Sequence, residues 1–184
     1  PIKKEIDYNI LSENYNKVNF DNFDFNTNID NLKDVELGAN ILLDSISKNL
    51  HICIVTDYDF DGISSAVVLT KGIKNILKHK NTTTVVNKRI YGNGFNPRIV
   101  RKILDINSDK KIDLIITADH GSNDDEYYIE LKNKIKDLKI ILTDHHTISK
   151  YPKNVDALIN PMREDSTCHN RSHEALKLQH FYYW

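Results

Sequence analysis

The sequence contains little cysteine, proline or glycine: its 184 residues include two Cys, four Pro and six Gly. The two cysteines, Cys53 and Cys168, are far apart and exclude a disulfide-rich scaffold. Cys53 lies in an apolar stretch, where a small core residue is expected. No apolar run approaches the ~20 residues that a membrane span requires, and the N-terminus lacks a signal-peptide pattern. These absences predict a reduced, cytoplasmic protein with no membrane segment.

The charge is balanced, with 25 basic and 26 acidic side chains and a net charge of −1. This balance does not favour any class of partner, so nucleic-acid binding would need a local basic patch. The hydrophobic share of 40% and the length suit one soluble domain with a sizeable core. The abundance of Asn, Lys and Ile is typical of an AT-rich genome, such as that of a virus.

Strand-like and helix-like segments alternate along most of the chain. Short apolar runs rich in β-branched residues predict strands, and the segments between them have a helical apolar period. Such alternation is typical of right-handed βαβ units. We therefore predict an α/β fold, with a mostly parallel sheet of about five strands flanked by helices. The predicted strands cover 50–56, 82–86, 112–118, 138–143 and 155–159, and the predicted helices follow an N-cap at Asp30 and cover 31–49, 62–79, 97–106 and 124–137.

The same pattern divides the chain into three parts. Residues 1–30, rich in Asn, Asp, Tyr and Phe, are predicted to form an N-terminal extension, and residues 31–163 the domain itself. Residues 164–184 form a tail, in which Cys168 and the nearby histidines lack the spacing of a common zinc site. The tail ends in the apolar run 181–184, which suggests that the chain has been cut from a longer protein.

Acidic and imidazole side chains follow three of the predicted strands. The carboxyl ends of strands in an open parallel sheet lie along one edge, where ligands bind, so these side chains are expected to converge. If the first set is extended, its three carboxylates point the same way and repel one another, and a divalent cation between them would relieve the repulsion. The three sets are Asp57, Asp59 and Asp61; Asp119 and His120; and Asp144, His145 and His146.

The ligand types narrow the choice of metal. Carboxylates suit Mg²⁺ and Mn²⁺, imidazole suits softer ions, and no cysteine joins the set. A mixed Asp/His site of this kind fits Mn²⁺ best, with Mg²⁺, Co²⁺ or Zn²⁺ as alternatives. Five or more ligands are more than one ion needs, so we predict two ions, roughly 3.5–4 Å apart, which suits displacement at a phosphoester.

Each set also has a simpler interpretation. Aspartate near a helix start is favourable without a metal, and Asp61 alone could act in this way. Adjacent histidines such as His145 and His146 are common on surface loops. The coincidence of three strand ends favours metal binding over these alternatives. For His120, contact with a substrate phosphate, a contribution to the metal site and a purely polar role all remain open.

The three sets resemble successive motifs of the DHH phosphoesterase superfamily, in particular its RecJ-like branch of single-strand exonucleases. The matching segments are 57–62, 119–121 and 144–146. Arg89 followed by the glycine-bearing segment 92–96 is similar to an Arg and Gly-Tyr-Gly segment of that branch, with a shorter spacing. The resemblance extends from about Leu32 to about Arg163, which identifies residues 31–163 as a DHH catalytic domain.

The resemblance implies a role for each matching residue and a substrate. It implies hydrolysis of single-stranded DNA from the 5′ end with Mn²⁺ as the cofactor, and DNA replication or repair proteins as partners. Asp144 would support the histidines rather than bind metal directly. Arg89 could bind phosphate through its planar guanidinium or be a surface charge. Gly92 and Gly94 would shape the same substrate-binding loop, or could only allow an unusual backbone angle. His120 would be a further substrate-binding residue beside this loop. The catalytic and metal-binding residues would be Asp59, Asp61, Asp119, His145 and His146, with Asp57 as a further ligand.

Two departures from the family pattern leave alternatives open. RecJ-like proteins usually have Asn where this chain has His120. They also carry a further metal-binding Asp and a nucleic-acid-binding domain downstream, and neither is found in these residues. The chain is therefore expected to be the catalytic piece of a longer protein or to have an incomplete metal site. The rival functions are hydrolysis of short oligonucleotides, cyclic dinucleotides or pyrophosphate, and an inactive DHH scaffold that binds partners.

Overall fold

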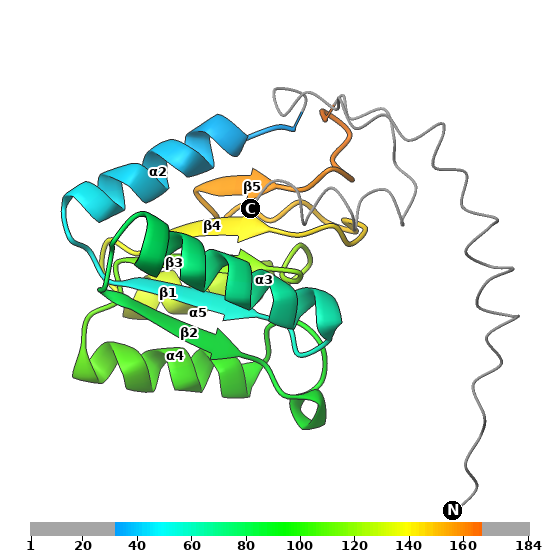
Figure 1. The fold of residues 1–184 in the computed structure, drawn as a ribbon. Helices are drawn as coiled ribbons and strands as arrows, with labels where there is room; N and C mark the ends of the chain where they lie inside the picture. The colour runs from blue at the N-terminus through cyan, green and yellow to red at the C-terminus, as the bar shows by residue number, and fades with distance from the viewer. Residues whose placement is uncertain (1–31, 167–184) are drawn as a thin grey trace, which may run out of the picture.

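The structure, a computed structural model, describes residues 32–166. Its centre is a sheet of five strands in the order β2-β1-β3-β4-β5, and all neighbouring pairs are parallel (Figure 1). The predicted α/β class and the parallel sheet are therefore confirmed. The strands are β1 (Ile52–Thr56), β2 (Thr82–Val86), β3 (Leu114–Ala118), β4 (Lys139–Thr143) and β5 (Ala157–Ile159).

Helices cover both faces of this sheet. One face packs against α2 and α3 and the other against α4 and α5, as the two apolar clusters of the core show (Figure 1). Successive residues of β1 alternate between these clusters: Ile52 and Ile54 belong to the first, and Cys53 and Val55 to the second. All of β1 is buried, as expected of a strand covered on both faces. The helices are α2 (Val35–Ser47), α3 (Phe60–Lys71), α4 (Pro97–Asp109) and α5 (Asp125–Lys134), with a π-helical turn at Gly72–Ile76 and a 3-10 turn at Arg89–Tyr91.

The predicted helix boundaries differ from the structure, and α4 ends later and α5 ends earlier than predicted. The helix predicted over 62–79 begins earlier, at Phe60, and passes into the π-helical turn after Lys71. The first helix begins at Val35, and Asp30 lies outside the described residues. Asp34, which precedes this helix, is left-handed with φ 64° and makes no side-chain cap.

The Asp34 carboxylate instead joins the first described helix to the last strand. Its Oδ2 accepts hydrogen bonds from Leu158 N at 3.1 Å and from Arg163 Nη1 at 2.6 Å. Arg163 is buried, and its other guanidinium nitrogens donate to both oxygens of Asp165 at 2.8 Å. This network explains why the chain turns back after β5.

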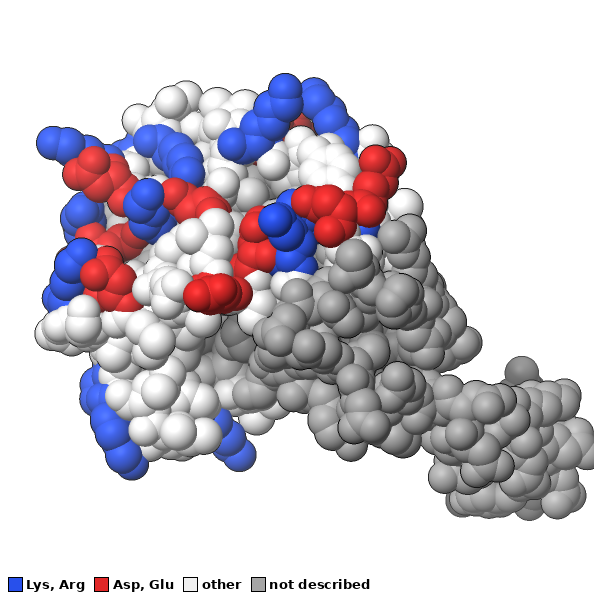
Figure 2. All heavy atoms as spheres, turned by 90° about the horizontal axis from the view of Figure 1, so that it is seen from above, with Lys and Arg blue, Asp and Glu red and all other residues white. Residues whose placement is uncertain are grey.

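Charge is mixed on the surface that can be seen from the α2 side. Figure 2 shows Lys and Arg side chains interspersed with Asp and Glu side chains there. Among residues 32–166, no helix has the length and apolar character needed to cross a bilayer. The predicted extension 1–30 and most of the predicted tail, including Cys168, lie outside the described residues.

Candidate metal centre

The site begins with the register of three neighbouring strands. Thr56 of β1 pairs with Ala118 of β3, and Ala118 pairs with Thr143 of β4. The next residue after each strand is an aspartate, so Asp57, Asp119 and Asp144 leave the carboxyl edge of the sheet at one level. The predicted convergence of the strand ends is therefore present in the fold.

Asp119 and His145 form a buried pair at this edge. Their side chains are 2% and 3% exposed, and His145 Nε2 donates to Asp119 Oδ1 at 2.8 Å. Burial and, to a smaller extent, the nearby Asp59 carboxylate raise the pKa of Asp119 to about 6, against the lowering effect of His145. Asp119 Oδ2 is buried without a hydrogen-bond partner among the described residues. A cation would satisfy this oxygen and offset the repulsion from Asp59.

Asp144 and His146 form a second pair. His146 Nδ1 donates to Asp144 Oδ1 at 2.7 Å, and this bond raises the pKa of His146 to about 9. Asp144 Oδ1 also accepts from the backbone N–H groups of His145 and His146, and Oδ2 accepts from Ser122 N. Although burial opposes ionisation, these bonds and the charge of His146 hold the pKa of Asp144 well below its usual range. Both of its oxygens are thus engaged by the protein, which suits a supporting role.

These four residues meet the geometric requirement for holding a cation. Asp119, Asp144, His145 and His146 each offer one ligand atom, and these atoms lie within 4.8 Å of one another. The donors are carboxylate oxygens and imidazole nitrogens without a thiolate, a set that suits a divalent metal ion. The unsatisfied oxygen of Asp119 and this donor set together fit a divalent ion.

The first motif, residues 57–62, adds three carboxylates to the site from the end of β1. Asp57 is buried and its Oδ1 accepts from Tyr58 N at 2.8 Å. Asp59 caps α3, because its Oδ1 accepts from Gly62 N at 3.0 Å. Although burial opposes it, this bond lowers the pKa of Asp59. Asp61 lies in the first turn of α3. The extended conformation expected for all three aspartates therefore ends at Asp59, since the helix begins at Phe60.

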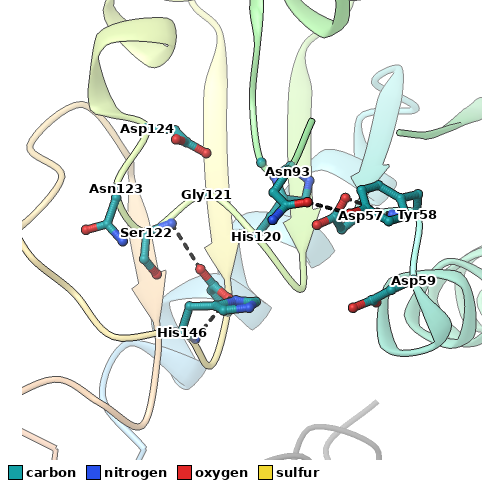
Figure 3. Close-up of a pocket in the computed structure, with 12 residues that line it drawn as sticks. Asp57, Tyr58, Asp59, Asn93, His120, Gly121, Ser122, Asn123, Asp124 and His146 are labelled. Atoms are coloured by element: carbon teal, nitrogen blue, oxygen red, sulfur yellow. Dashed lines mark hydrogen bonds and ion pairs between the residues drawn. The ribbon is translucent and has the colours of Figure 1, made fainter. Parts of the chain in front are cut away.

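A cavity of about 300 Å³ lies between these motifs. Figure 3 shows Asp57 and Asp59 on one side of it and Ser122, Asn123 and His146 on the other. Asp61, Asp119 and His145 are not part of its lining, and Asp119 and His145 are buried. Its lining consists of Asp57, Tyr58, Asp59, Asn93, Gly94, residues 120–124, Asp144 and His146.

His120 is a buried member of this lining. Its Nε2 lies 3.1 Å from Val55 O, and because a carbonyl only accepts, Nε2 carries the proton. Burial lowers the pKa of His120, so the ring is neutral and Nδ1 bears a lone pair. A neutral ring in this tautomer cannot donate from Nδ1 to a phosphate. Of the three roles left open for His120, contact with phosphate as a donor is therefore disfavoured.

The predicted substrate loop lies at the rim. The guanidinium carbon of Arg89 is 5.7 Å from the centre of the Tyr58 ring, but Arg89 is exposed and does not line the cavity. Gly92 and Gly94 have φ values of 87° and 67°, which only glycine adopts readily. A Cβ at Gly94 would lie 2.7 Å from Asp124 Oδ2, so this glycine also allows a close approach. Gly94 lines the cavity and Gly92 does not.

Several polar residues of the site were not predicted. Ser122 fixes Asp144 through its backbone, and Asn160 Nδ2 donates to Ser122 Oγ at 2.8 Å. Asp124 Oδ2 accepts from Phe95 N at 2.9 Å, and burial raises its pKa. Asn87 bonds Asp57 and the glycine loop. Only the position of Asn87 directly after a strand could have indicated it.

Residues 51–175 match the DHH family, N-terminal domain. The chain belongs to this family. Members of the DHH family are metal-dependent phosphoesterases, the class that the three motifs predict. The predicted RecJ-like character is confirmed by the curated proteins that the chain resembles.

Two of these DHH relatives are single-stranded-DNA-specific exonucleases RecJ. The protein from Haemophilus influenzae is 25% identical over 134 residues, which are 73% of this chain and 22% of that protein. The protein from Dickeya dadantii is 24% identical over 128 residues, or 70% of this chain and 21% of that protein. The chain thus spans about a fifth of the length of these relatives.

Solved DHH structures share the fold. A crystal structure of exonuclease RecJ bound to manganese has a TM-score of 0.66 and 22% identity, and the match covers 83% of this chain and 37% of that one. A RecJ complex with Mn²⁺ from Thermus thermophilus has a TM-score of 0.60 and 19% identity, over 82% of this chain and 20% of that one. At these identities the likeness establishes the architecture of the DHH domain.

Proposed function

We propose that this DHH domain hydrolyses phosphodiester bonds in single-stranded DNA from the 5′ end, with two Mn²⁺ ions as cofactor. The observation that carries the proposal is the common level of Asp57, Asp119 and Asp144 at the carboxyl edge of the sheet. Two histidines complete this edge beside a polar cavity. The choice of substrate and polarity comes from the RecJ relatives, and Mg²⁺ is the alternative ion.

The residues proposed to hold the ions come from all three motifs. Asp119 would help to hold the ions, since its carboxylate contacts His145 and lies near the Asp59 carboxylate. The ions when bound would activate water and neutralise phosphoryl oxygens. The proposed ligands are Asp57, Asp59, Asp61, Asp119, His145 and His146.

The chain's own hydrogen bonds prepare these ligands. Asp144 orients the His146 ring through Nδ1, which leaves Nε2 for the metal side of the ring. The backbone N–H of Gly62 fixes one oxygen of Asp59, whose carboxylate lies near Asp119. The residues are thus held near their working positions before a cation arrives.

The cavity rim offers groups for a nucleic-acid strand. Arg89 lies over Tyr58, and the guanidinium carbon of Arg98 lies 4.7 Å from the centre of the Tyr91 ring. Cations contact phosphates, and aromatic rings stack on unpaired bases without sequence preference. Arg89 is the proposed phosphate ligand because its guanidinium lies over the ring of Tyr58, which lines the cavity.

A substrate panel tests the proposal. The full chain, with Mn²⁺, is assayed on single-stranded oligonucleotides labelled at either end, on a dinucleotide, a cyclic dinucleotide and pyrophosphate. We expect mononucleotide release from the 5′ end of the long strands. Preference for the short substrates would favour a different DHH activity. Absence of Mn²⁺ binding in a calorimetric titration would instead favour an inactive scaffold.

A further inference from the structure

Asn87 connects two parts of the site that are far apart in the sequence. It directly follows β2, the strand beside β1, and is 4% exposed. Its Nδ2 lies 3.3 Å from Asp57 Oδ1, 2.8 Å from Gly92 O and 3.2 Å from Gly94 O. Its Oδ1 accepts from Lys88 N at 2.8 Å. One buried amide therefore contacts the first aspartate of the metal site and both glycines of the loop.

The loop of residues 88–95 depends on this amide for its shape. Gly92 and Gly94 have positive φ values, and the short 3-10 turn between Lys88 and Gly92 supplies only the backbone bonds Tyr91 N to Lys88 O and Gly92 N to Arg89 O. The loop's other contacts are the bond from Tyr58 Oη to Asn93 Oδ1, the bond from Phe95 N to Asp124 and the packing of the buried Phe95 ring against His120 and Tyr128. Phe95 thus fixes the end of the loop, and Asn87 is the buried polar group that holds Gly92 and Gly94.

The chemistry of the position requires an amide. The three groups around Nδ2 are all acceptors, a carboxylate and two carbonyls, while the group at Oδ1 is a donor. Asparagine supplies two donors and an acceptor in this volume, whereas aspartate would place a charge against three acceptors. Buried amides left without these bonds cost free energy, so the arrangement holds as a unit.

We propose that Asn87 is a positioning residue that holds loop 88–95 at a fixed distance from Asp57. The inference rests on the proposed function, because the loop carries Arg89, the proposed phosphate ligand. Asp57 keeps its bond from Tyr58 N at 2.8 Å without Asn87. Loss of Asn87 therefore releases the loop while the metal side of the site stays in place.

The test compares substitutions of two asparagines, Asn87 directly after β2 and Asn81 directly before it. Asn87→Asp keeps the shape and removes the donors, and Asn87→Ala removes the amide. The matched control is Asn81→Ala, at the other end of β2, where Nδ2 donates to Asn49 O at 2.9 Å, away from the site. Asn87→Ser, with one donor, replaces the Ala variant if the latter does not fold. Each variant is assayed with Mn²⁺ on a long oligonucleotide and on bis(p-nitrophenyl) phosphate, and amide hydrogen exchange is followed by mass spectrometry.

A released loop has a specific pattern of effects. In both Asn87 variants we expect kcat/KM for the oligonucleotide to fall on the order of 10–100-fold, mainly through KM, because the phosphate ligand is no longer held. In Asn87→Ala, activity on the small diester and Mn²⁺ affinity should change little, whereas in Asn87→Asp the added carboxylate also faces Asp57 and should alter both. Exchange should rise over residues 88–95 and not in the neighbouring strands. Asn81→Ala should show none of these changes.

Other outcomes distinguish a failure of the positioning role of Asn87 from a failure of the proposed hydrolytic function. In Asn87→Ala, equal losses on both substrates, or exchange over 88–95 identical to that of the unaltered protein, would overturn the positioning role. If the unaltered protein hydrolyses neither substrate, the proposed function fails. The exchange comparison between the Asn87 variants and Asn81→Ala still decides whether the amide holds the loop.

Discussion

His145 Nε2 donates a hydrogen bond to Asp119 Oδ1 at 2.8 Å, and both side chains are almost completely buried. The two residues follow adjacent strands, β3 and β4, so the sheet itself sets their separation. In the absence of a cation each group satisfies the other in part. A metal ion would replace the shared proton and bind both residues.

Replacement of Asp119 should separate metal binding from folding. Asp119 has φ 65°, which asparagine tolerates better than alanine, so Asp119→Asn is the sharper variant. We expect Mn²⁺ affinity to fall more than about 100-fold, because even partners outside the coordination sphere cost roughly 10–100-fold. Hydrolysis should be lost with it, and Asp119→Ala should also be inactive. Calorimetric titration and thermal unfolding measure the two effects.

The same variant should not lower stability in the absence of metal. Burial raises the pKa of Asp119 from 3.8 to about 6, so this group's stabilising contribution is complete below pH 3.8 and is lost as the pH rises through 6. At pH 7 the neutral asparagine avoids that loss. Asp105→Asn, at an exposed position of α4, is the control. A variant at position 119 that binds Mn²⁺ normally would remove this residue from the ligand set.

Metal binding should release protons and become tighter as the pH rises. The bond to Asp144 raises the pKa of His146 to about 9, so the metal-free ring is protonated at pH 7 and must lose that proton to bind a cation. Affinity should rise about tenfold per pH unit up to pH 9, and more steeply below pH 6, where Asp119 also takes up a proton. Titrations in buffers of different ionisation enthalpy count the protons. An affinity independent of pH between 6 and 9 would contradict a ligand role for His146.

Gly62 should tolerate no side chain. A Cβ there would meet the backbone carbonyl group of Asp57, and backbone cannot move aside as a flexible side chain can. We expect Gly62→Ala to destabilise the protein by about 1–3 kcal/mol and to displace the first motif. Gly72→Ala is the matched control, because a Cβ there would have no neighbour within 4 Å. Urea denaturation and Mn²⁺ titration of both variants provide the measurement. Similar behaviour of the two would show that the start of α3 is not closely packed.

Arg89 should act through the substrate and not through the metal. We expect Arg89→Ala to raise KM for an oligonucleotide and to reduce the slope of log affinity against log salt by about 1, as loss of one phosphate contact does. The exposed Lys80, before the amino end of β2, supplies the control Lys80→Ala. Fluorescence anisotropy at several salt concentrations measures the slope. An unchanged slope for Arg89→Ala would identify this residue as an ordinary surface charge.

The sheet and the site were predictable for the same reason. Buried parallel strands are continuous apolar runs, and the strand predicted over 82–86 has the bounds of β2. A polar residue directly after such a run must lie at the carboxyl edge, which is why Asp119 and Asp144 could be placed together. Local sequence was sufficient to place these residues, because residues that directly follow neighbouring parallel strands lie at the same edge of the sheet.

The remaining features depend on contacts between distant segments. Nothing in the local sequence distinguishes Asp34 from other polar residues near a helix start, yet its partner Arg163 is 129 residues away. The π-helical turn after Lys71 interrupts a pattern that is apolar and helical throughout. Asn87 was missed because asparagine in a loop usually indicates only a turn. Such roles appear only when the partners are known.

The bond between Asp34 and Arg163 has a consequence for protein engineering. It fastens the beginning of the described domain to its end, beside β5 and at the margin of the sheet, whereas β1, β3 and β4 carry the metal site. Fusion partners could be attached at both ends without rearranging the reactive edge. An excised domain that omits Arg163 would leave the half-buried Asp34 carboxylate without its ion-pair partner, and one that omits Asp34 would leave Arg163 paired with Asp165 alone.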